Sequence, residues 1–302
     1  MTRTEHDTWD TTSSVGATAT GCAVVRALAS RQSHPLIDDP FAAALVQQAG
    51  VDAFTQVVDG QLAPSDVFGP LAPAIIDSMA VRTASHDYFA LDRVAQGTAQ
   101  VVMLASGLDT RAYRLAWTSG TTVFDVDLES VTTFKSTTLA ALGFSPSSDH
   151  RPVGADLRYD WSTRLLAAGF DPGKRAVWLV EGLLPYLPPD AQDALLDNIT
   201  GLSAPDSALI IESVTDARSP EHDEFQAELD QVSERQRQQG HDLDIGTLMY
   251  EGDRHETASY LNTAGWTTTQ VSATELFASC GRPLAHGERP FPDGRTVLAT
   301  KG

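Results

Sequence analysis

Four carboxylates stand at the ends of three short apolar segments beyond residue 100. Asp125 and Asp127 end the segment TVFDVD, Asp156 follows PVGA, and Glu181 follows VWLV. In doubly wound α/β proteins, ligands bind at the carboxyl ends of parallel strands, and an acid ending the second strand accepts hydrogen bonds from ribose hydroxyls. These carboxylates therefore make a ribose-containing ligand the first chemistry to consider.

Asp125 and Asp127 share one face of their strand. Side chains alternate along a strand, so Phe124 and Val126 face one way and the two acids face the other. Burying two carboxylates is costly unless they bind something. A solvated strand end explains the same pattern equally well, and the sequence leaves both interpretations open.

The later acids have distinct interpretations. Asp156 could accept a hydrogen bond from an adenine amino group while Leu157 packs against the ring, or Asp156 could simply cap a turn. Glu181 ends a buried strand beside Gly182, which favours a role in positioning cofactor or substrate over filling the core. Glu181 and Tyr186 are the candidates for positioning the reacting groups, and no catalytic acid or base is assigned.

A small-residue turn follows the first apolar segment. Residues 101–104 are apolar, Ala105-Ser106-Gly107 follows, and Asp109 is the expected N-cap of a helix. Such a turn lets a ligand contact main-chain N–H groups and a helix N-terminus. An ordinary tight connection is the alternative interpretation.

Other residues that could do chemistry occur singly. Arg82 lies on an expected helix of 73–96, where a solvated position is the simpler interpretation; His34, His86 and His150 are isolated. The chain contains no HExxH and no GxSxG, so metal hydrolysis and serine hydrolase chemistry have little support, and no metal is expected.

Alternating strands and helices are expected to position these residues. Seven strand-like segments and the helices between them predict an α/β fold with a doubly wound, mostly parallel seven-stranded sheet. The expected strands lie near 100–105, 121–127, 150–156, 175–181, 207–213, 266–271 and 295–300. The expected parts are a flexible arm at 1–14, a helical N-terminal lid at 15–98, an α/β core at 99–302 and an inserted helical cap at 216–252.

Composition narrows the function further. The net charge of −19 disfavours nucleic acid and anionic membranes as partners. Two cysteines far apart disfavour a disulfide framework, and residues 1–14 lack the apolar region of a secretory signal. A cytoplasmic protein, monomeric or homodimeric, with a small-molecule substrate is expected.

Taken together and in this order, the motifs closely resemble one family. It is the leucine carboxyl methyltransferase-like group of S-adenosylmethionine-dependent O-methyltransferases, which includes polyketide carboxyl methyltransferases. The matching segments are SSVGATA (13–19), HPLIDDPFA (34–42), Arg82 in MAVRT, ASGLDTRAYRL (105–115), VFDVDLESVTTFK (123–135), GADLRYDW (154–161), VWLVEGLLPYLPP (177–189) and LNTAGW (261–266).

The resemblance implies a Rossmann-like class I methyltransferase fold with S-adenosylmethionine as cofactor. It implies that Arg82 pairs with the methionyl carboxylate and that the turn at 105–107 lies under the methionine portion. The remaining cofactor-binding residues that it implies are Asp127 at the ribose, with Asp125 close enough to share that role, Asp156 and Leu157 at the adenine, and Glu181 near the amino group. The family turn is usually Gly-Ala-Gly, whereas this chain has alanine at position 105.

The implied reaction is methyl transfer to the carboxylate of a small, apolar, polyketide-like acid. A carboxylate is already ionised at pH 7 and needs no general base, whereas a phenol or enol acceptor would need one, for which His86 is a candidate. Two alternatives remain: a nicotinamide-dependent oxidoreductase, although ASGLDT departs from GxGxxG, and a non-catalytic S-adenosylmethionine-binding protein.

Overall fold

The computed structural model describes most of the chain. The described residues are 14–213, 227, 234, 248–250, 252–284, 290 and 294–302, and side chains are described from residue 18 onward. The expected arm at 1–14, apart from Ser14, and most of the expected cap at 216–252 lie outside these ranges. The division into an arm, a lid and a capped core therefore stays a prediction.

Seven strands form one sheet in the order β3-β2-β1-β4-β5-β7-β6. The pairs from β3 to β5 are parallel, and β7 runs antiparallel to both of its neighbours. The mostly parallel, doubly wound sheet is thus confirmed. The strands are β1 (Gln100–Leu104), β2 (Thr122–Asp127), β3 (Asp149–Gly154), β4 (Ala176–Val180), β5 (Ala208–Ser213), β6 (Trp266–Ser272) and β7 (Arg295–Lys301).

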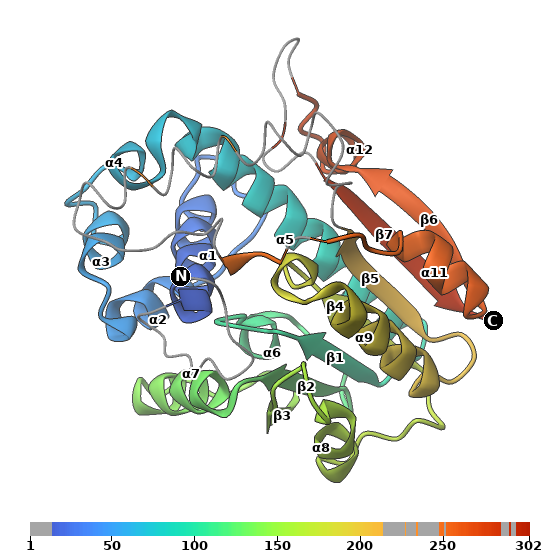
Figure 1. Cartoon of the computed structure of the whole chain (residues 1–302). Helices are drawn as coiled ribbons and strands as arrows, with labels where there is room; N and C mark the ends of the chain where they lie inside the picture. The colour runs from blue at the N-terminus through green and yellow to red at the C-terminus, as the bar shows by residue number, and fades with distance from the viewer. Residues whose placement is uncertain are drawn as a thin grey trace.

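Helices cover both faces of this sheet (Figure 1). The short 3-10 turns are η1 (Gly69–Leu71) and η2 (Leu184–Tyr186). The α-helices are α1 (Ser14–Ser30), α2 (Ala42–Ala49), α3 (Asp52–Val58), α4 (Pro64–Phe68), α5 (Ala72–Ala95), α6 (Arg111–Arg114), α7 (Glu129–Ala141), α8 (Trp161–Ala167), α9 (Pro189–Gly201), α11 (Thr257–Thr263) and α12 (Ala273–Ser279). Within the described ranges, none of them is long and apolar enough to cross a membrane.

The central strands are buried on both faces because their side chains alternate between two cores. Val101 and Met103 of β1 join the core formed with α1 and α5, and Val102 and Leu104 join the core formed with α8, α9 and α11. Burial on both faces explains why β1 and β4 read as continuous apolar runs.

A buried ion pair attaches the N-terminal helices to the core. Arg26 of α1 donates through Nε to Asp39 at 2.9 Å and through Nη2 to the carbonyl of Leu108 at 2.5 Å. Asp39 also accepts from the backbone N–H groups of Phe41 and Ala42, and so caps the start of α2. Both charged side chains are at least nine-tenths buried.

We expect Arg26→Met to lower the free energy of unfolding by about 3 kcal/mol, because it leaves the Asp39 carboxylate buried without its cation. Denaturant unfolding measures the change, and adding Asp39→Asn should recover part of the loss. The matched control is Lys174→Met, which removes an exposed pair with Asp171 and should leave stability nearly unchanged. Equal losses in the two single variants would contradict a structural role for the buried pair.

Candidate cofactor and acceptor site

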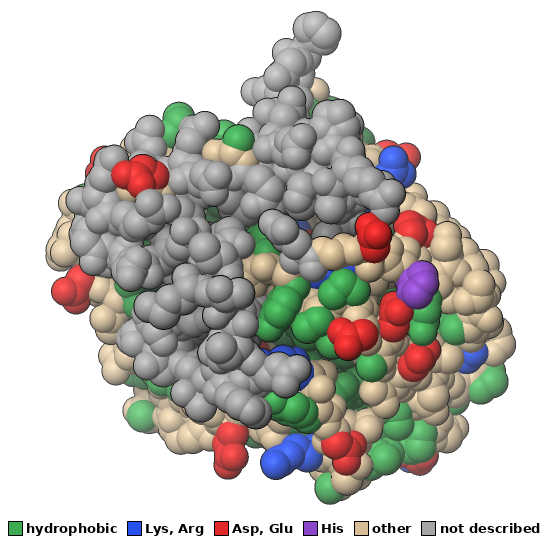
Figure 2. Space-filling model, viewed as in Figure 1, with side chains coloured by type: hydrophobic (Ala, Val, Ile, Leu, Met, Phe, Trp, Pro, Cys, Tyr) green, Lys and Arg blue, Asp and Glu red, His purple; other side chains and the backbone are tan. Residues whose placement is uncertain are grey.

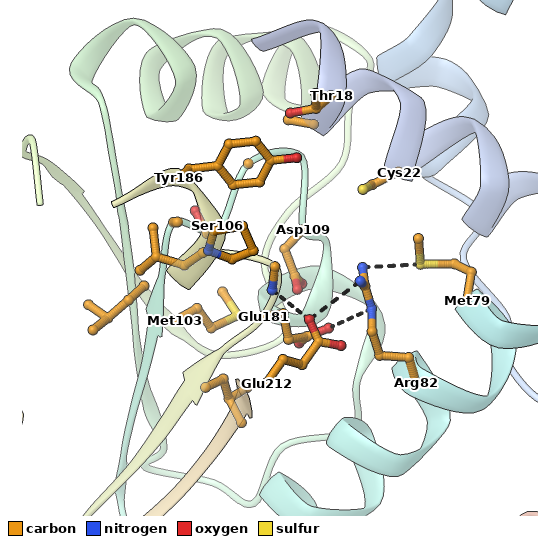
Figure 3. A pocket seen from close by; sticks show the side chains of 18 of the residues that line it. Thr18, Cys22, Met79, Arg82, Met103, Ser106, Asp109, Glu181, Tyr186 and Glu212 are labelled. Atoms are coloured by element: carbon orange, nitrogen blue, oxygen red, sulfur yellow. Dashed lines mark hydrogen bonds and ion pairs between the residues drawn. The ribbon is translucent and has the colours of Figure 1, made fainter. Parts of the chain in front are cut away.

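A cavity of about 460 Å³ opens at the carboxyl ends of β1, β2, β4 and β5. Side chains from α1, α5, η2 and α12 complete its walls, so its lining comes from segments far apart in the chain (Figure 3). Its size is in the usual range for small-molecule sites. Except for Asp125, the sequence-predicted site residues line this one cavity.

The small-residue turn forms the cavity floor under β1. Ala105 has φ +52° and Gly107 has φ +51°, so both lie in the left-handed region, where alanine is strained. A Cβ on Gly107 would lie 2.9 Å from the Cβ of Ala19 on α1. Glycine at 107 therefore lets α1 approach the turn.

Asp127 holds the turn from the neighbouring strand. Its Oδ2 accepts the Gly107 N–H at 2.7 Å and its Oδ1 accepts the Leu128 N–H at 2.7 Å. Burial raises the pKa of Asp127, and these two donors oppose that rise without cancelling it. The carboxylate lies on the cavity wall, at the position expected of a ribose-binding acid.

Asp125 does not share this position. Its carboxylate is 1% exposed and is bound by Lys135 at 2.8 Å and His150 at 3.0 Å. Burial raises the pKa of Asp125, but Lys135 and His150 outweigh it and hold that pKa below its ordinary value. The geometry thus gives no support to the idea that Asp125 contacts a ligand, because Lys135 contacts both of its oxygens and His150 contacts Oδ2 inside the protein.

The helix after the turn differs from expectation. It is a single turn, α6, and its N-cap is Thr110 instead of Asp109. Asp109 still meets the helix start, because its Oδ1 accepts the Arg111 N–H at 2.7 Å. A four-residue helix has little dipole to offer a ligand. The N–H groups of Ser106 and Gly107 already donate inside the protein, to the Val126 carbonyl and to Asp127.

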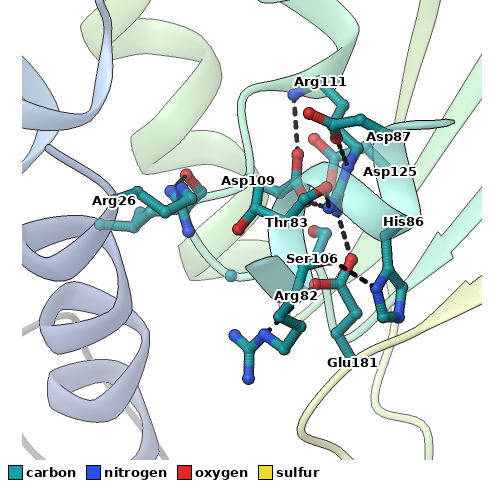
Figure 4. Close-up of polar contacts among 12 residues, drawn as sticks. Arg26, Arg82, Thr83, His86, Asp87, Ser106, Asp109, Arg111, Asp125 and Glu181 are labelled. Atoms are coloured by element: carbon teal, nitrogen blue, oxygen red, sulfur yellow. Dashed lines mark hydrogen bonds and ion pairs between the residues drawn. The ribbon is translucent and has the colours of Figure 1, made fainter. Parts of the chain in front are cut away.

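Arg111 is the buried cation beside the cavity (Figure 4). Its side chain is 2% exposed and pairs with Asp87 on α5, with Asp109 and with Glu181. Burial raises the pKa of Glu181, but Arg111, together with smaller contributions that include Arg82, outweighs that effect and holds the pKa below its ordinary value. The same balance lowers the pKa of Asp109.

Arg82 extends from α5 into the cavity. Its guanidinium lies 3.6 Å from Glu181 and 3.6 Å from Glu212, and its side chain remains 24% exposed (Figure 3). Burial lowers the pKa of Arg82, but Glu212 and Glu181 reverse the shift and the group stays charged. Because Arg82 lines the cavity, an anion that enters the cavity can meet this cation directly.

The far end of the cavity carries Asp156, Leu157 and Arg158. Arg158 donates to Asp156 through Nε at 3.0 Å and Nη2 at 2.7 Å. Tyr186 of η2 also lines the cavity (Figure 3).

The three histidines singled out in the sequence are not among the residues that line the cavity. His86 is fully buried, and its Nδ1 lies 2.9 Å from the Arg82 carbonyl oxygen. His150 pairs with Asp125, and the His34 carbonyl accepts from Arg282. The geometry does not favour His86 as a general base, because it is not among the residues that line this cavity.

Sequence reasoning missed Glu212 and Arg111. Glu212 lines the cavity and accepts the Gly182 N–H through Oε2 at 2.6 Å. The sequence did indicate Glu212, because it follows the apolar run ALII just as Glu181 follows VWLV. Arg111 had no such signal, because two of its partners, Asp87 and Glu181, come from distant segments.

Comparison with known proteins identifies the family. The leucine carboxyl methyltransferase family model matches residues 19–200. This chain belongs to that family. Two relatives are described as S-adenosyl-L-methionine-dependent methyltransferases. The one from Mycobacterium sp. strain JLS is 47% identical, and the alignment covers 100% of both chains. The one from Frankia alni is 48% identical, and the alignment covers 94% of this chain and 92% of the relative. The chain is therefore an S-adenosylmethionine-dependent methyltransferase, not a nicotinamide-dependent oxidoreductase or a non-catalytic binding protein.

Solved structures share its fold. A methyltransferase structure from Thermobifida fusca aligns with a TM-score of 0.53 at 18% identity, covering 93% of this chain and 94% of the other. A DUF574 family protein from Streptomyces avermitilis aligns with a TM-score of 0.54 at 15% identity, covering 93% and 97%. These likenesses confirm the Rossmann-like methyltransferase fold.

The cavity's chemistry fits the family's cofactor. S-adenosylmethionine carries a carboxylate, an ammonium group, a ribose and an adenine, and the cavity offers a cation at Arg82, carboxylates at Glu181 and Asp127, and an acid beside an apolar side chain at Asp156 and Leu157. The close approach of α1 at Gly107 leaves the turn's main chain at the cavity wall.

Ala105→Gly should raise the free energy of unfolding by about 1 kcal/mol, because glycine adopts a positive φ without the steric cost of a Cβ. Cofactor affinity, measured by calorimetry, should stay equal or improve. The matched control is Ala194→Gly at an exposed site within α9, where the same change should cost about 1 kcal/mol. A loss of stability at both positions would mean that the turn conformation is wrong.

Proposed function

We propose that this methyltransferase converts the carboxylate of a small apolar acid into its methyl ester. The proposal is supported by the state of the cavity's acids. Glu181 faces Arg82 and Arg111, Asp109 faces Arg111, and the pKa of each carboxyl is held below its ordinary value. Such carboxylates are weak bases, which suits an acceptor that arrives already ionised.

In this proposal the chain's residues hold the cofactor by its charged and polar ends. Arg82 pairs with the methionyl carboxylate and Glu181 with the amino group, while Asp127 accepts from the ribose hydroxyls. Asp156 and Leu157 contact the adenine. The turn at 105–107, whose residues line the cavity, lies under the methionine portion.

The acceptor is proposed to occupy the apolar end of the cavity. Its walls there come from α5, η2 and α12, and the residues are Ile75, Met79, Pro185, Leu276 and Phe277. Bound S-adenosylmethionine supplies a methyl group on a positively charged sulfur, which the carboxylate oxygen displaces in line. The walls exclude water from the carboxylate nucleophile. Because acceptor and methyl group are held side by side, the reaction no longer depends on a bimolecular encounter in solution.

Incubation with a panel of apolar acids and methyl-labelled S-adenosylmethionine tests the reaction. We expect a labelled product that mild alkali cleaves to release labelled methanol. Heat-inactivated protein and the chain with S-adenosylhomocysteine added are the controls. Transfer of label into an alkali-stable product would contradict ester formation and indicate an ether.

Glu212 favours a second candidate, a phenol or enol acceptor. Its Oε2 accepts the Gly182 N–H and lies 3.6 Å from Nη1 of Arg82, whereas Glu181 pairs closely with the buried Arg111, so the Glu212 carboxylate is held less tightly than that of Glu181. A carboxylate at the cavity wall could take the hydroxyl proton as oxygen attacks the methyl group.

Glu212→Gln distinguishes the two candidates. For a hydroxyl acceptor, kcat should fall by about 10²-fold or more, because the base is lost. For a carboxylate acceptor, kcat should change by less than about threefold, because no proton moves. Initial rates at saturating acceptor measure kcat, with cofactor affinity of the variant as the control.

A further inference from the structure

A fully buried lysine lies beneath the cofactor turn. Lys135 of α7 is 0% exposed, and its Nζ lies 2.9 Å from Asp125 Oδ1 and 3.3 Å from the Ser106 hydroxyl. Burying an ammonium group is costly, and an ion pair inside a protein is weak evidence of stability alone. The placement against Ser106, which lines the cavity, therefore calls for a functional explanation.

We propose that Lys135 is a positioning residue for cofactor binding, whose buried ammonium group anchors the turn at Ser106 and keeps the neighbouring Asp127 carboxylate charged to receive the ribose hydroxyls. The inference rests on the proposed placement of the ribose at Asp127. It goes beyond that placement because it names Lys135, on α7, as the group that keeps Asp127 ionised and able to accept hydrogen bonds from the ribose.

The first part of the argument is geometric. The Ser106 hydroxyl is tied to Lys135, its N–H donates to the Val126 carbonyl at 3.2 Å, and its carbonyl accepts the Asp109 N–H at 2.9 Å. Its neighbours Ala105 and Gly107 both have positive φ. A strained turn persists only where its surroundings hold it, and Lys135 is a fixed point on the side away from the cavity.

The second part is electrostatic. Asp127 is half-buried on the same strand face as the fully buried Asp125, and desolvation, with a smaller contribution from Asp125, raises its pKa. The N–H groups of Gly107 and Leu128 oppose this, and so does the charge of Lys135, more strongly than Asp125 acts in the other direction. Lys135 thus favours the ionised form of an acid whose surroundings favour the neutral one.

The other charged groups around Lys135 have their own partners. On β3, His150 lies 3.0 Å from Asp125, and the ring of Tyr113 on α6 packs edge-on against His150 at 5.3 Å. After the turn, Asp109 pairs with Arg111, and Arg26, Arg114 and Lys135 also act on it. Loss of Lys135 would leave Asp125 with His150 and leave Asp127 with its two N–H donors.

Lys135→Met tests the proposal through the pH dependence of S-adenosylhomocysteine affinity, measured by calorimetry from pH 5.5 to 8.5. Without the cation the pKa of Asp127 rises, so the neutral acid forms at higher pH and affinity is lost first on the acid side. We expect a loss of about tenfold or more at pH 6 and less than about threefold at pH 8.5, relative to the unchanged protein. Lys135→Arg, which keeps the charge, should restore the original pH profile in part.

Further variants separate the possible failures. Lys174→Met, at an exposed lysine, should leave the profile unchanged. If Lys135→Met does not fold, Lys135→Met combined with Asp125→Asn buries no unpaired charge and should shift the profile in the same direction by less. If Asp127→Asn leaves affinity intact, the proposed ribose placement is wrong. If Asp127→Asn weakens binding but the lysine variants keep the original pH profile, the role of Lys135 is purely structural and the inference is overturned.

Discussion

The buried guanidinium of Arg111 is the interaction on which the site depends. It binds Asp87 of α5, Asp109 after the turn and Glu181 at the end of β4, and so joins three segments that form the cavity. Three carboxylates around one cation would repel each other without it, and a buried charge left unpaired is costly. Arg111 thereby fixes both the position of Glu181 and its ionised state, while Arg82 is left facing the cavity.

The site separates charges that support the fold from charges available to a ligand. Arg26, Arg111 and Lys135 are nearly or fully buried and each is held by carboxylates, whereas Arg82 keeps a quarter of its side chain exposed. On the outer surface, acidic side chains gather over α9 and α11 with few basic ones among them (Figure 2). This distribution agrees with the net charge of −19 and with a ligand recognised inside a cavity instead of on the surface.

The fold could be predicted because the sequence patterns that indicate its strands and helices are local. Parts of the site could not be predicted, because they depend on contacts between residues far apart in the chain. Apolar runs ended by Asp127 and Glu181 indicate strands and a ligand-binding edge directly. Asp125 is turned away from the cavity role by its contacts with Lys135 and His150, which lie on two other elements. The sequence alone therefore could not tell which of Asp125 and Asp127 lines the cavity. Helix α12 was not expected, although its capping box of Ser272 and Glu275 is a readable signal.

The contact between Ala19 and Gly107 has a thermodynamic consequence. Because α1 meets the turn where no Cβ fits, the docking of α1 and the shape of the cavity at this turn depend on each other. If the cofactor binds at this turn as proposed, helix docking and cofactor binding are coupled. Thermodynamic coupling is reciprocal: the free energy by which helix docking stabilises the bound cofactor equals the free energy by which the bound cofactor stabilises the docked helix. The cellular supply of S-adenosylmethionine would then help to set how often the N-terminal helices detach.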